Sequence, residues 1–232
     1  MHKHRTPPET FDIFPSPVSV YNYSKHEEVK ELIYRVISES NETLNSNSNA
    51  LFHYGNDMGE SILYNEGFET FKNWVEECCE DYVQKVLGNY LPDKMMVTDS
   101  WVNIANKGAF QYYHYHGNSI VSGTYYINFD EEHVPLFFKH PNTFEGQHLP
   151  VFEMEKGPTT KYNSDARINV YEGGLYLWRS HMPHGYPVNP KDDRISLSMN
   201  FIPNYISSGK YGFKATTISR EEVQQMRDSI SP

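Results

Sequence analysis

Hydrophobic residues in the first part of the chain recur at helical spacing. In "SKHEEVKELIYRVISES" (residues 24–40), apolar side chains at positions 29, 32, 33, 36 and 37 would share one face, which predicts an amphipathic helix near residues 25–39. Ser24, with Glu27 three residues later, forms a capping-box sequence that predicts where this helix begins. Residues 67–88 carry a second helical pattern, whose broad, aromatic-rich apolar face we expect to be core.

After Pro92 the pattern changes to short aromatic and β-branched runs separated by Gly, Pro, Asn and Asp. The runs are "DSWVNIAN", "SIVSGTYYINF", "VPLFFKH", "GGLYLWRS" and "RISLSMNFIP". Short strands with turn residues between them are typical of an antiparallel sandwich or barrel. We therefore predict an α+β, mainly β fold class, in which N-terminal helices pack on a jelly roll.

These elements fit a single domain, residues 1–232, because β-rich folds of this length are often undivided. The domain would consist of a helical support region (1–92), a jelly-roll core (93–203) and a C-terminal tail (204–232). The polar segment "NETLNSNSN" (residues 41–49) is predicted to be a loop. In the tail, "SREEVQQMRDSI" (residues 219–230) predicts a short closing helix, with a second capping box formed by Ser219 and Glu222.

Composition excludes several classes of partner. The formal net charge of −10 argues against a nucleic-acid backbone or an anionic membrane. The hydrophobic runs are shorter than a membrane span, and "MHKHRTPPETFDIF" lacks the apolar core of a signal peptide. Cys78 and Cys79 are adjacent, so a disulfide framework is not expected, and we predict two buried thiols in a cytoplasmic protein.

Two histidines stand two positions apart in "QYYHYHGNS" (residues 111–119). In an extended strand, residues i and i+2 project from the same face, so His114 and His116 would converge on one point. Such a pair is either part of a polar strand rim or two thirds of a metal site. A lone histidine is more often a surface or hydrogen-bonded residue, and we assign His133, His140 and His148 to that class.

A second polar group follows in "SHMPHGYPVNPKDDRIS" (residues 180–196). Arg194 heads the polar face of the alternating strand "RISLSMNF", and a buried guanidinium is unfavourable unless it is paired. Asp192 or Asp193, just before the strand, could pair with it. A ligand carboxylate would also satisfy Arg194, through two parallel hydrogen bonds and a third from Ser196.

The order HxH, "SGTYY", "PHG" and "RIS" resembles the small 2-oxoglutarate- and Fe(II)-dependent oxygenases, a branch of the double-stranded β-helix dioxygenases related to the prolyl hydroxylases. The opening "FDIFPSPVSVYNY" is also similar, so the resemblance covers most of residues 11–203. It implies a double-stranded β-helix core that uses Fe(II), 2-oxoglutarate and O2. By position, it makes His114 and His184 metal ligands, and Arg194 with Ser196 the site of the cosubstrate carboxylate.

His116 departs from the family pattern, because the wider superfamily carries Asp or Glu there. An imidazole keeps a donor atom but removes one negative charge from the metal's ligands. His116 is either the third ligand, which we favour, or a residue beside the ligands. His181 competes with His184, but only His184 has the family spacing to Arg194.

Five residues are candidates for the pocket wall, although each one taken alone would more often be core. They are Trp101, Asn103, Tyr112, Tyr126 and Trp178. We assign Asn103 and Tyr126 to the cosubstrate site together with Arg194 and Ser196. The catalytic set is then His114, His116, His184 and Arg194.

The resemblance implies a dioxygenase that hydroxylates a peptide side chain or a small molecule, with release of succinate and CO2. One alternative is a three-histidine oxygenase of the cupin type that does not use 2-oxoglutarate and would not need Arg194 and Ser196 at this spacing. Another is a non-enzymatic jelly-roll binding module with fortuitous histidines. The sequence leaves the substrate and the oligomeric state open.

Overall fold

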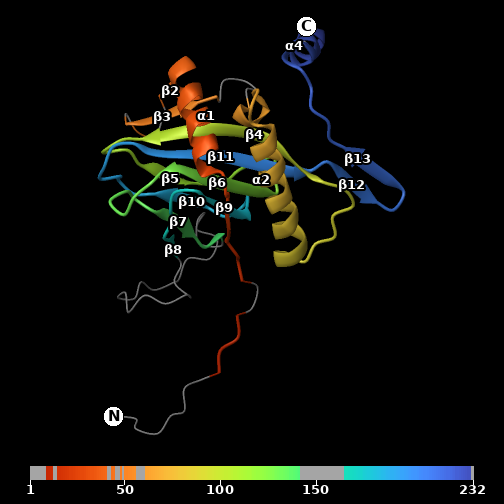
Figure 1. The fold of residues 1–232 in the computed structure, drawn as a ribbon. Coiled ribbons are helices and arrows are strands. Elements are labelled where there is room, and N and C mark those ends of the chain that lie inside the picture. Colours follow the sequence, from red (N-terminus) through yellow and green to blue (C-terminus); the bar gives the residue numbers. More distant parts are fainter. Residues whose placement is uncertain are drawn as a thin grey trace.

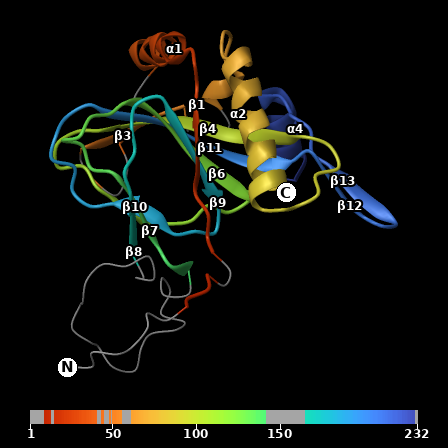
Figure 2. The ribbon, with the colours of Figure 1, turned by 60° about the horizontal axis from the view of Figure 1, so that its bottom comes forward.

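Two antiparallel sheets lie face to face, and two helices cover the outer face of the larger sheet (Figure 1). The computed structural model describes residues 9–12, 15–40, 43–44, 48, 50–55, 61–141 and 165–230. Figure 2 shows helices α1 (His26–Glu39) and α2 (Glu69–Asp81) on one side of the larger sheet, and strands of the smaller sheet on the other. This architecture confirms the mainly β fold with supporting N-terminal helices.

The larger sheet has seven strands in the order β1-β9-β6-β11-β4-β3-β2. Their bounds are β1 Ser19–Asn22, β9 Gly174–Arg179, β6 Val121–Asn128, β11 Arg194–Pro203, β4 Met95–Ala105, β3 Leu51–Tyr54 and β2 Thr43–Leu44. The smaller sheet has the order β5-β10-β7-β8. Its strands are β5 Gln111–His114, β10 His184–Tyr186, β7 Leu136–Lys139 and β8 Asp165–Ile168.

Side-chain alternation along β11 decides where the core and the cavity lie. Its apolar positions 195, 197, 199 and 201 pack with α1 and α2 in the main core, on the outer face of the larger sheet. Its polar positions 194, 196, 198 and 200 face the opposite way and line a cavity between the two sheets. The predicted division of this strand into two faces is confirmed. Cys78 and Cys79 are buried in the main core, as expected.

The first helix begins at His26, and the predicted capping box at Ser24 is wrong. Lys25 occupies the N-cap position, and no side chain caps the helix. Ser24 is therefore one residue too early to reach the free N–H groups of the first turn. The helix start is held instead by His26, whose ring nitrogens contact the Tyr125 hydroxyl at 2.8 Å and the Glu172 carboxylate at 3.1 Å.

One short helical segment and two edge strands were not predicted. Ile62–Tyr64 forms a 3-10 turn, whereas the π-helical turn Tyr82–Val86 continues α2 within the helical stretch predicted for residues 67–88. The expected loop "NETLNSNSN" contains strand β2, which pairs with β3; positions 41, 42, 45–47 and 49 lie outside the described residues. Strand β1 was also missed, because its four residues gain their stability from pairing with β9 rather than from a local pattern.

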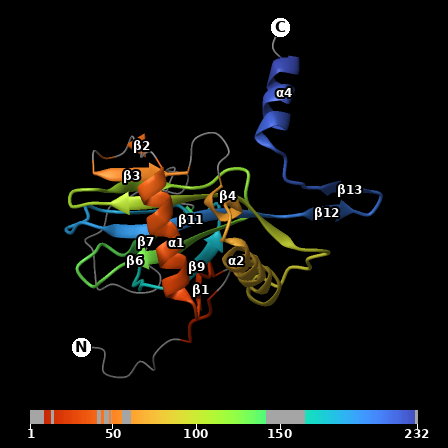
Figure 3. The ribbon, with the colours of Figure 1, turned by 45° about the horizontal axis from the view of Figure 1, so that its top comes forward.

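The tail forms a separate ribbon and helix beyond the sheets, as Figure 3 shows. Strands β12 (Tyr205–Ser208) and β13 (Tyr211–Lys214) pair as a hairpin that the sequence did not predict. The closing helix α4 (Arg220–Ile230) was predicted, and so was its capping box. The Ser219 N–H donates to the Glu222 carboxylate at 2.6 Å, and the Glu222 N–H donates to the Ser219 hydroxyl at 3.2 Å. No helix in the described part of the chain is long and apolar enough to cross a membrane.

Candidate active site

A cavity of about 350 Å³ lies between the two sheets. Its floor consists of the inward-facing residues of β4, β6 and β11, which are adjacent strands of the larger sheet. Residues of β5, β7 and β10, from the smaller sheet, line the opposite side. The three histidines and the arginine predicted from the sequence all line this cavity: His114, His116, His184 and Arg194.

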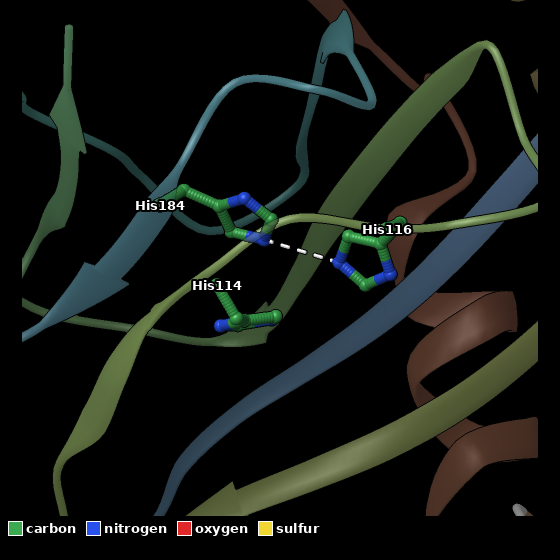
Figure 4. Close-up of side chains that lie close together, drawn as sticks. All are labelled: His114, His116 and His184. Atoms are coloured by element: carbon green, nitrogen blue, oxygen red, sulfur yellow. Dashed lines mark hydrogen bonds between the residues drawn. The ribbon is translucent and has the colours of Figure 1, made fainter. Parts of the chain in front are cut away.

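The three imidazoles converge, as Figure 4 shows. Each offers one nitrogen, and these three nitrogens lie within 4.8 Å of one another. The Nε2 atoms of His116 and His184 are 3.2 Å apart, a separation at which one ion can contact both nitrogens. His114 ends β5 and His184 begins β10, and the pairing of these strands sets the two residues opposite each other.

Backbone carbonyls orient two of the three rings. The Nδ1 atom of His114 lies 2.9 Å from the carbonyl oxygen of Tyr112, and that of His184 lies 3.0 Å from the carbonyl oxygen of Met182. A carbonyl accepts a hydrogen bond, so Nδ1 must carry the hydrogen, and the lone pair of each ring is on Nε2. Metal-binding histidines are commonly held in this way, with the second nitrogen donating to a fixed acceptor.

His116 is held differently, because its Nδ1 atom faces the amide nitrogen of Asn200 at 3.4 Å. That amide is fixed: its nitrogen donates to Asp99 at 2.7 Å, and its oxygen accepts from the Ser122 hydroxyl at 2.8 Å. An amide N–H requires an acceptor, which places the lone pair of the His116 ring on Nδ1. In this arrangement His116 Nε2–H donates to His184 Nε2.

Burial keeps the three imidazoles neutral. Burial, and to a smaller extent the nearby His114, lowers the pKa of His116 to about 4. Burial lowers the pKa of His114, and it lowers the pKa of His184 well below its usual value. Neutral imidazoles retain the lone pairs that a metal ion needs. Phe138 and Trp178 surround His184, with the Trp178 ring 4.7 Å from its imidazole.

Arg194 lies at the other end of the cavity and is only 2% exposed. Its Nε donates to the Val134 carbonyl at 2.9 Å and one terminal nitrogen donates to the Tyr126 hydroxyl at 3.2 Å. The guanidinium also lies over the Tyr186 ring, 4.2 Å from the centroid. Among the described residues it forms no ion pair, so neither Asp192 nor Asp193 supplies the carboxylate that the sequence allowed for.

The remaining predicted cosubstrate residues surround Arg194. Ser196 is buried and follows it on the same face of β11, opposite Asn103 on β4 and Tyr126 on β6. Tyr126 is fully buried, and burial raises the pKa of its hydroxyl, so the hydroxyl keeps its hydrogen. Asn103 donates to the Ser198 hydroxyl at 3.0 Å. All three residues line the cavity.

Other candidate residues divide clearly. Trp101 and Trp178 line the cavity, but Tyr112 is 65% exposed and is not a pocket wall, because it points out of β5 on the face opposite to Gln111.

His181 is exposed and is not part of the histidine cluster, which supports the choice of His184. His133 is hydrogen-bonded to the Asp192 carbonyl, and His140 is exposed, as assigned. His148 lies outside the described residues.

Several residues of the cavity were not identified from the sequence as part of the site. Among them are His53, Asp99 and Asn200. Asn200 could have been found, because it shares the polar face of β11 with Arg194. Asp99 and His53 reach the cavity through pairing of β4 with β11 and of β3 with β4, which no local pattern indicates.

Comparison with known proteins finds a similar family for the part of the chain that holds the site. Residues 99–200 match a family model described as "Putative 2OG-Fe(II) oxygenase". None of the curated proteins matches the chain by sequence.

Solved structures share the fold at low sequence identity. An oxidoreductase of the 2OG-Fe(II) oxygenase family from Burkholderia pseudomallei superposes with a TM-score of 0.53 at 11% identity, covering 79% of this chain and 84% of that chain. HygX from Streptomyces hygroscopicus, with nickel, 2-oxoglutarate and hygromycin B bound, gives 0.51 at 11% identity over 81% and 83%. A prolyl hydroxylase from Trichoplax adhaerens, in complex with a hypoxia inducible factor peptide fragment, gives 0.52 at 16% identity over 80% and 83%. These structural matches confirm the predicted double-stranded β-helix fold, and residues 99–200 are similar to the 2OG-Fe(II) oxygenase family.

Proposed function

We propose that this chain is a non-haem Fe(II)- and 2-oxoglutarate-dependent dioxygenase that hydroxylates a peptide side chain or a small molecule. One observation carries the proposal. A buried guanidinium, Arg194, without a carboxylate partner among the described residues, lines the same cavity as three converging neutral imidazoles. A metal ion and an anionic cosubstrate together would satisfy both groups.

The histidine cluster fits a divalent metal ion such as Fe(II). Imidazole nitrogen is a suitable donor for iron, and the burial of these rings keeps their lone pairs free at neutral pH. His114 and His184 would bind the ion through Nε2, because their Nδ1 atoms already donate to carbonyls. His116 would be the third ligand, after its Nε2 loses the hydrogen that it now shares with His184.

The arginine end of the cavity fits the distal carboxylate of 2-oxoglutarate. Arg194 has five N–H donors, of which the described contacts use two. The Tyr126 hydroxyl accepts from Arg194, so its own hydrogen is available to a carboxylate oxygen. Ser196 and Asn103 would add further polar contacts beside it.

Iron, 2-oxoglutarate and O2, when bound, would supply the oxidation of a C–H bond to an alcohol, with succinate and CO2 as by-products. The chain itself would position the metal ion and 2-oxoglutarate. It would also exclude water, because Leu136, Trp178 and Tyr186 form part of the cavity wall. The relatives bound to a peptide fragment and to hygromycin B support both a peptide and a small-molecule substrate as classes to test. A cytoplasmic location and a single domain over residues 1–232 remain predictions.

Succinate release tests the proposal. Protein reconstituted with Fe(II) should convert 2-oxoglutarate to succinate in an O2-dependent reaction, even slowly without the primary substrate. The variants His184→Ala and Arg194→Ala should lose this activity. A cupin-type three-histidine oxygenase would bind iron but form no succinate from 2-oxoglutarate, and a binding module would do neither.

A further inference from the structure

The cavity floor is charged at both ends. Strand register places inward-facing residues of β4, β11 and β6 in rows across the sheet. From one end to the other, these rows are Asn103–Ser196–Tyr126, Trp101–Ser198–Thr124 and Asp99–Asn200–Ser122, and Arg194 precedes the first. Strands rise about 3.3 Å per residue, so the α-carbons of Arg194 and Asn200 are roughly 20 Å apart. The floor therefore has the guanidinium of Arg194 at one end and the carboxylate of Asp99 at the other.

Asp99 is a fixed carboxylate with free acceptor capacity. Its Oδ2 atom accepts from the Asn200 amide at 2.7 Å and from the Thr98 hydroxyl at 3.5 Å. The Oδ1 atom accepts no hydrogen bond from any described residue, and the carboxylate forms no ion pair within that part of the chain. Among the described residues that line the cavity, Asp99 is the one carboxylate and Arg194 the one guanidinium, and no lysine is present.

Asp99 lies at the histidine end of the floor, away from Arg194. Asn200, which pairs with Asp99 in the last row and contacts its carboxylate, also contacts Nδ1 of His116 at 3.4 Å, whereas Arg194 precedes the first row. A dicarboxylic cosubstrate anchored at Arg194 would occupy the first part of this path. The Asp99 end is then left for the second substrate.

The neighbouring row supplies a surface for a hydrocarbon chain. Trp101 lines the cavity one row from Asp99, with its ring 5.6 Å from that of His116. Long basic side chains lay their methylene groups along apolar surfaces and keep the charged end free, and indole faces attract cations. A substrate that crosses Trp101 and ends at Asp99 would pass beside the histidine cluster.

We propose that Asp99 anchors a cationic primary substrate, an amine or guanidinium on an aliphatic stem such as a basic amino-acid side chain. This inference rests on the proposed function, in that the histidine cluster holds the metal and Arg194 holds the cosubstrate. Asp99 is the residue that selects charge, and Asn200 and Ser122 position it.

Matched probes test the selection of charge. Arginine and citrulline differ by a guanidinium against a neutral urea of nearly the same shape. Both are titrated as free amino acids, and as the central residue of a capped tripeptide, into anaerobic protein loaded with Mn(II) and 2-oxoglutarate. We expect the charged member to bind at least about tenfold more tightly, which corresponds to about 1.4 kcal/mol. Comparing the free amino acids with the capped tripeptides distinguishes a free amino-acid substrate from a peptide substrate.

Substitutions assign the effect to Asp99. Asp99→Asn, and Asp99→Ser as a second variant, should remove the preference for arginine while leaving the affinity for citrulline within about twofold. Glu77→Gln makes the same change in net charge at an exposed position of α2 and should behave as wild type. Thermal midpoints of all the variants establish that the compared proteins are folded.

Three results of the probe titrations would overturn the inference. They are equal binding of charged and neutral probes by wild type, a preference that survives in both Asp99 variants, and no binding of any probe at millimolar concentration. If Asp99→Asn weakened Mn(II) binding but kept the preference for arginine over citrulline, the inference would also be overturned. Asp99 would then support metal binding rather than substrate binding. Titrations of Mn(II) and 2-oxoglutarate alone are made first, because failure there rejects the proposed function separately.

Discussion

His184 lies directly opposite His114 across the antiparallel strands β10 and β5, with 4.5 Å between the two ring centroids. The distance between these strands therefore sets the distance between two proposed ligands. Gly185, the next residue of β10, allows the close approach: a Cβ atom there would lie 2.5 Å from the Gln111 carbonyl oxygen and 3.0 Å from that of Tyr112.

Replacing Gly185 with alanine should therefore separate the two histidines. Backbone oxygens cannot move aside as a flexible side chain can, so β10 must shift away from β5. We expect Gly185→Ala to weaken Mn(II) binding by about tenfold or more, measured by calorimetric titration. Gly117→Ala is the control, because its added Cβ would meet no atom within 4 Å. Equal metal affinity in both variants would show that strand spacing does not set the site.

Removing either His114 or His184 should abolish stoichiometric iron binding. Each ring offers an Nε2 lone pair to the metal, and an alanine side chain has no donor atom to replace it. His181→Ala, three residues from His184 but exposed, should bind iron as wild type does. The metal-free variants should stay folded, because the main core lies on the opposite face of the larger sheet. Anaerobic metal analysis that finds unchanged iron in both variants would remove the metal site.

His116 should contribute to metal binding, and aspartate should replace it. We expect His116→Ala to weaken Mn(II) binding by about tenfold, since one of three donors is lost. His116→Asp should retain the metal, because a carboxylate is a good donor for iron and needs no change of tautomer. Identical affinities for wild type and His116→Ala would show that His116 is not a ligand.

The metal-free protein should lose stability as the pH falls from about 6.5 to 4. Burial, together with the neighbouring His114, lowers the pKa of His53 and of His116 to about 4. The unfolded chain takes up protons below about pH 6.5 while the folded chain does not, so this stability is complete above that pH and declines below it. Thermal midpoints across this window should fall, and they should fall less in the double variant His53→Gln/His116→Gln. A flat profile, or equal slopes, would contradict the account.

The strands of the core could be predicted because their local patterns agree with their surroundings. On β11, alternation alone separated the residues of the main core from those of the cavity, and Arg194 was identified because a buried charge needs a partner. His114 drew attention through its two-residue spacing from His116, and the family resemblance, which includes the spacing of His184 to Arg194, implied that His114 and His184 are ligands.

Other features depend on contacts that no local pattern records. Ser24 has the residue type of a helix cap, but the contacts of His26 with Tyr125 and Glu172 hold the helix start so that the N-cap is one residue later, at Lys25. In the sequence, Asp99 is simply one polar residue of a predicted strand. Only the register of β4 on β11 places it in the cavity beside Asn200. Tyr112 was misplaced because strict alternation would put it on the same face as His114, whereas the pairing of β5 with β10 is irregular between His114 and Gln111 and leaves Tyr112 65% exposed.

The central claim is that Arg194 binds the carboxylate of 2-oxoglutarate. A bidentate, charge-assisted contact is worth about 1.5–3 kcal/mol or more when shielded from water, and each step of about 1.4 kcal/mol is tenfold in affinity. Arg194→Ala should therefore weaken 2-oxoglutarate by roughly ten- to a hundredfold. Arg194→Lys should recover only part of this, because a point charge cannot reproduce the planar fork.

The most direct measurement is calorimetric titration of 2-oxoglutarate into anaerobic, Mn(II)-loaded protein. Wild type and the exposed control Arg179→Ala should bind alike, Arg194→Ala should bind roughly ten- to a hundredfold more weakly, and Ser196→Ala should show a smaller loss. Mn(II) affinity should be the same in all four proteins, because none of these residues is a ligand. Absence of 2-oxoglutarate binding to wild type at millimolar concentration, or equal binding without Arg194, would contradict the account.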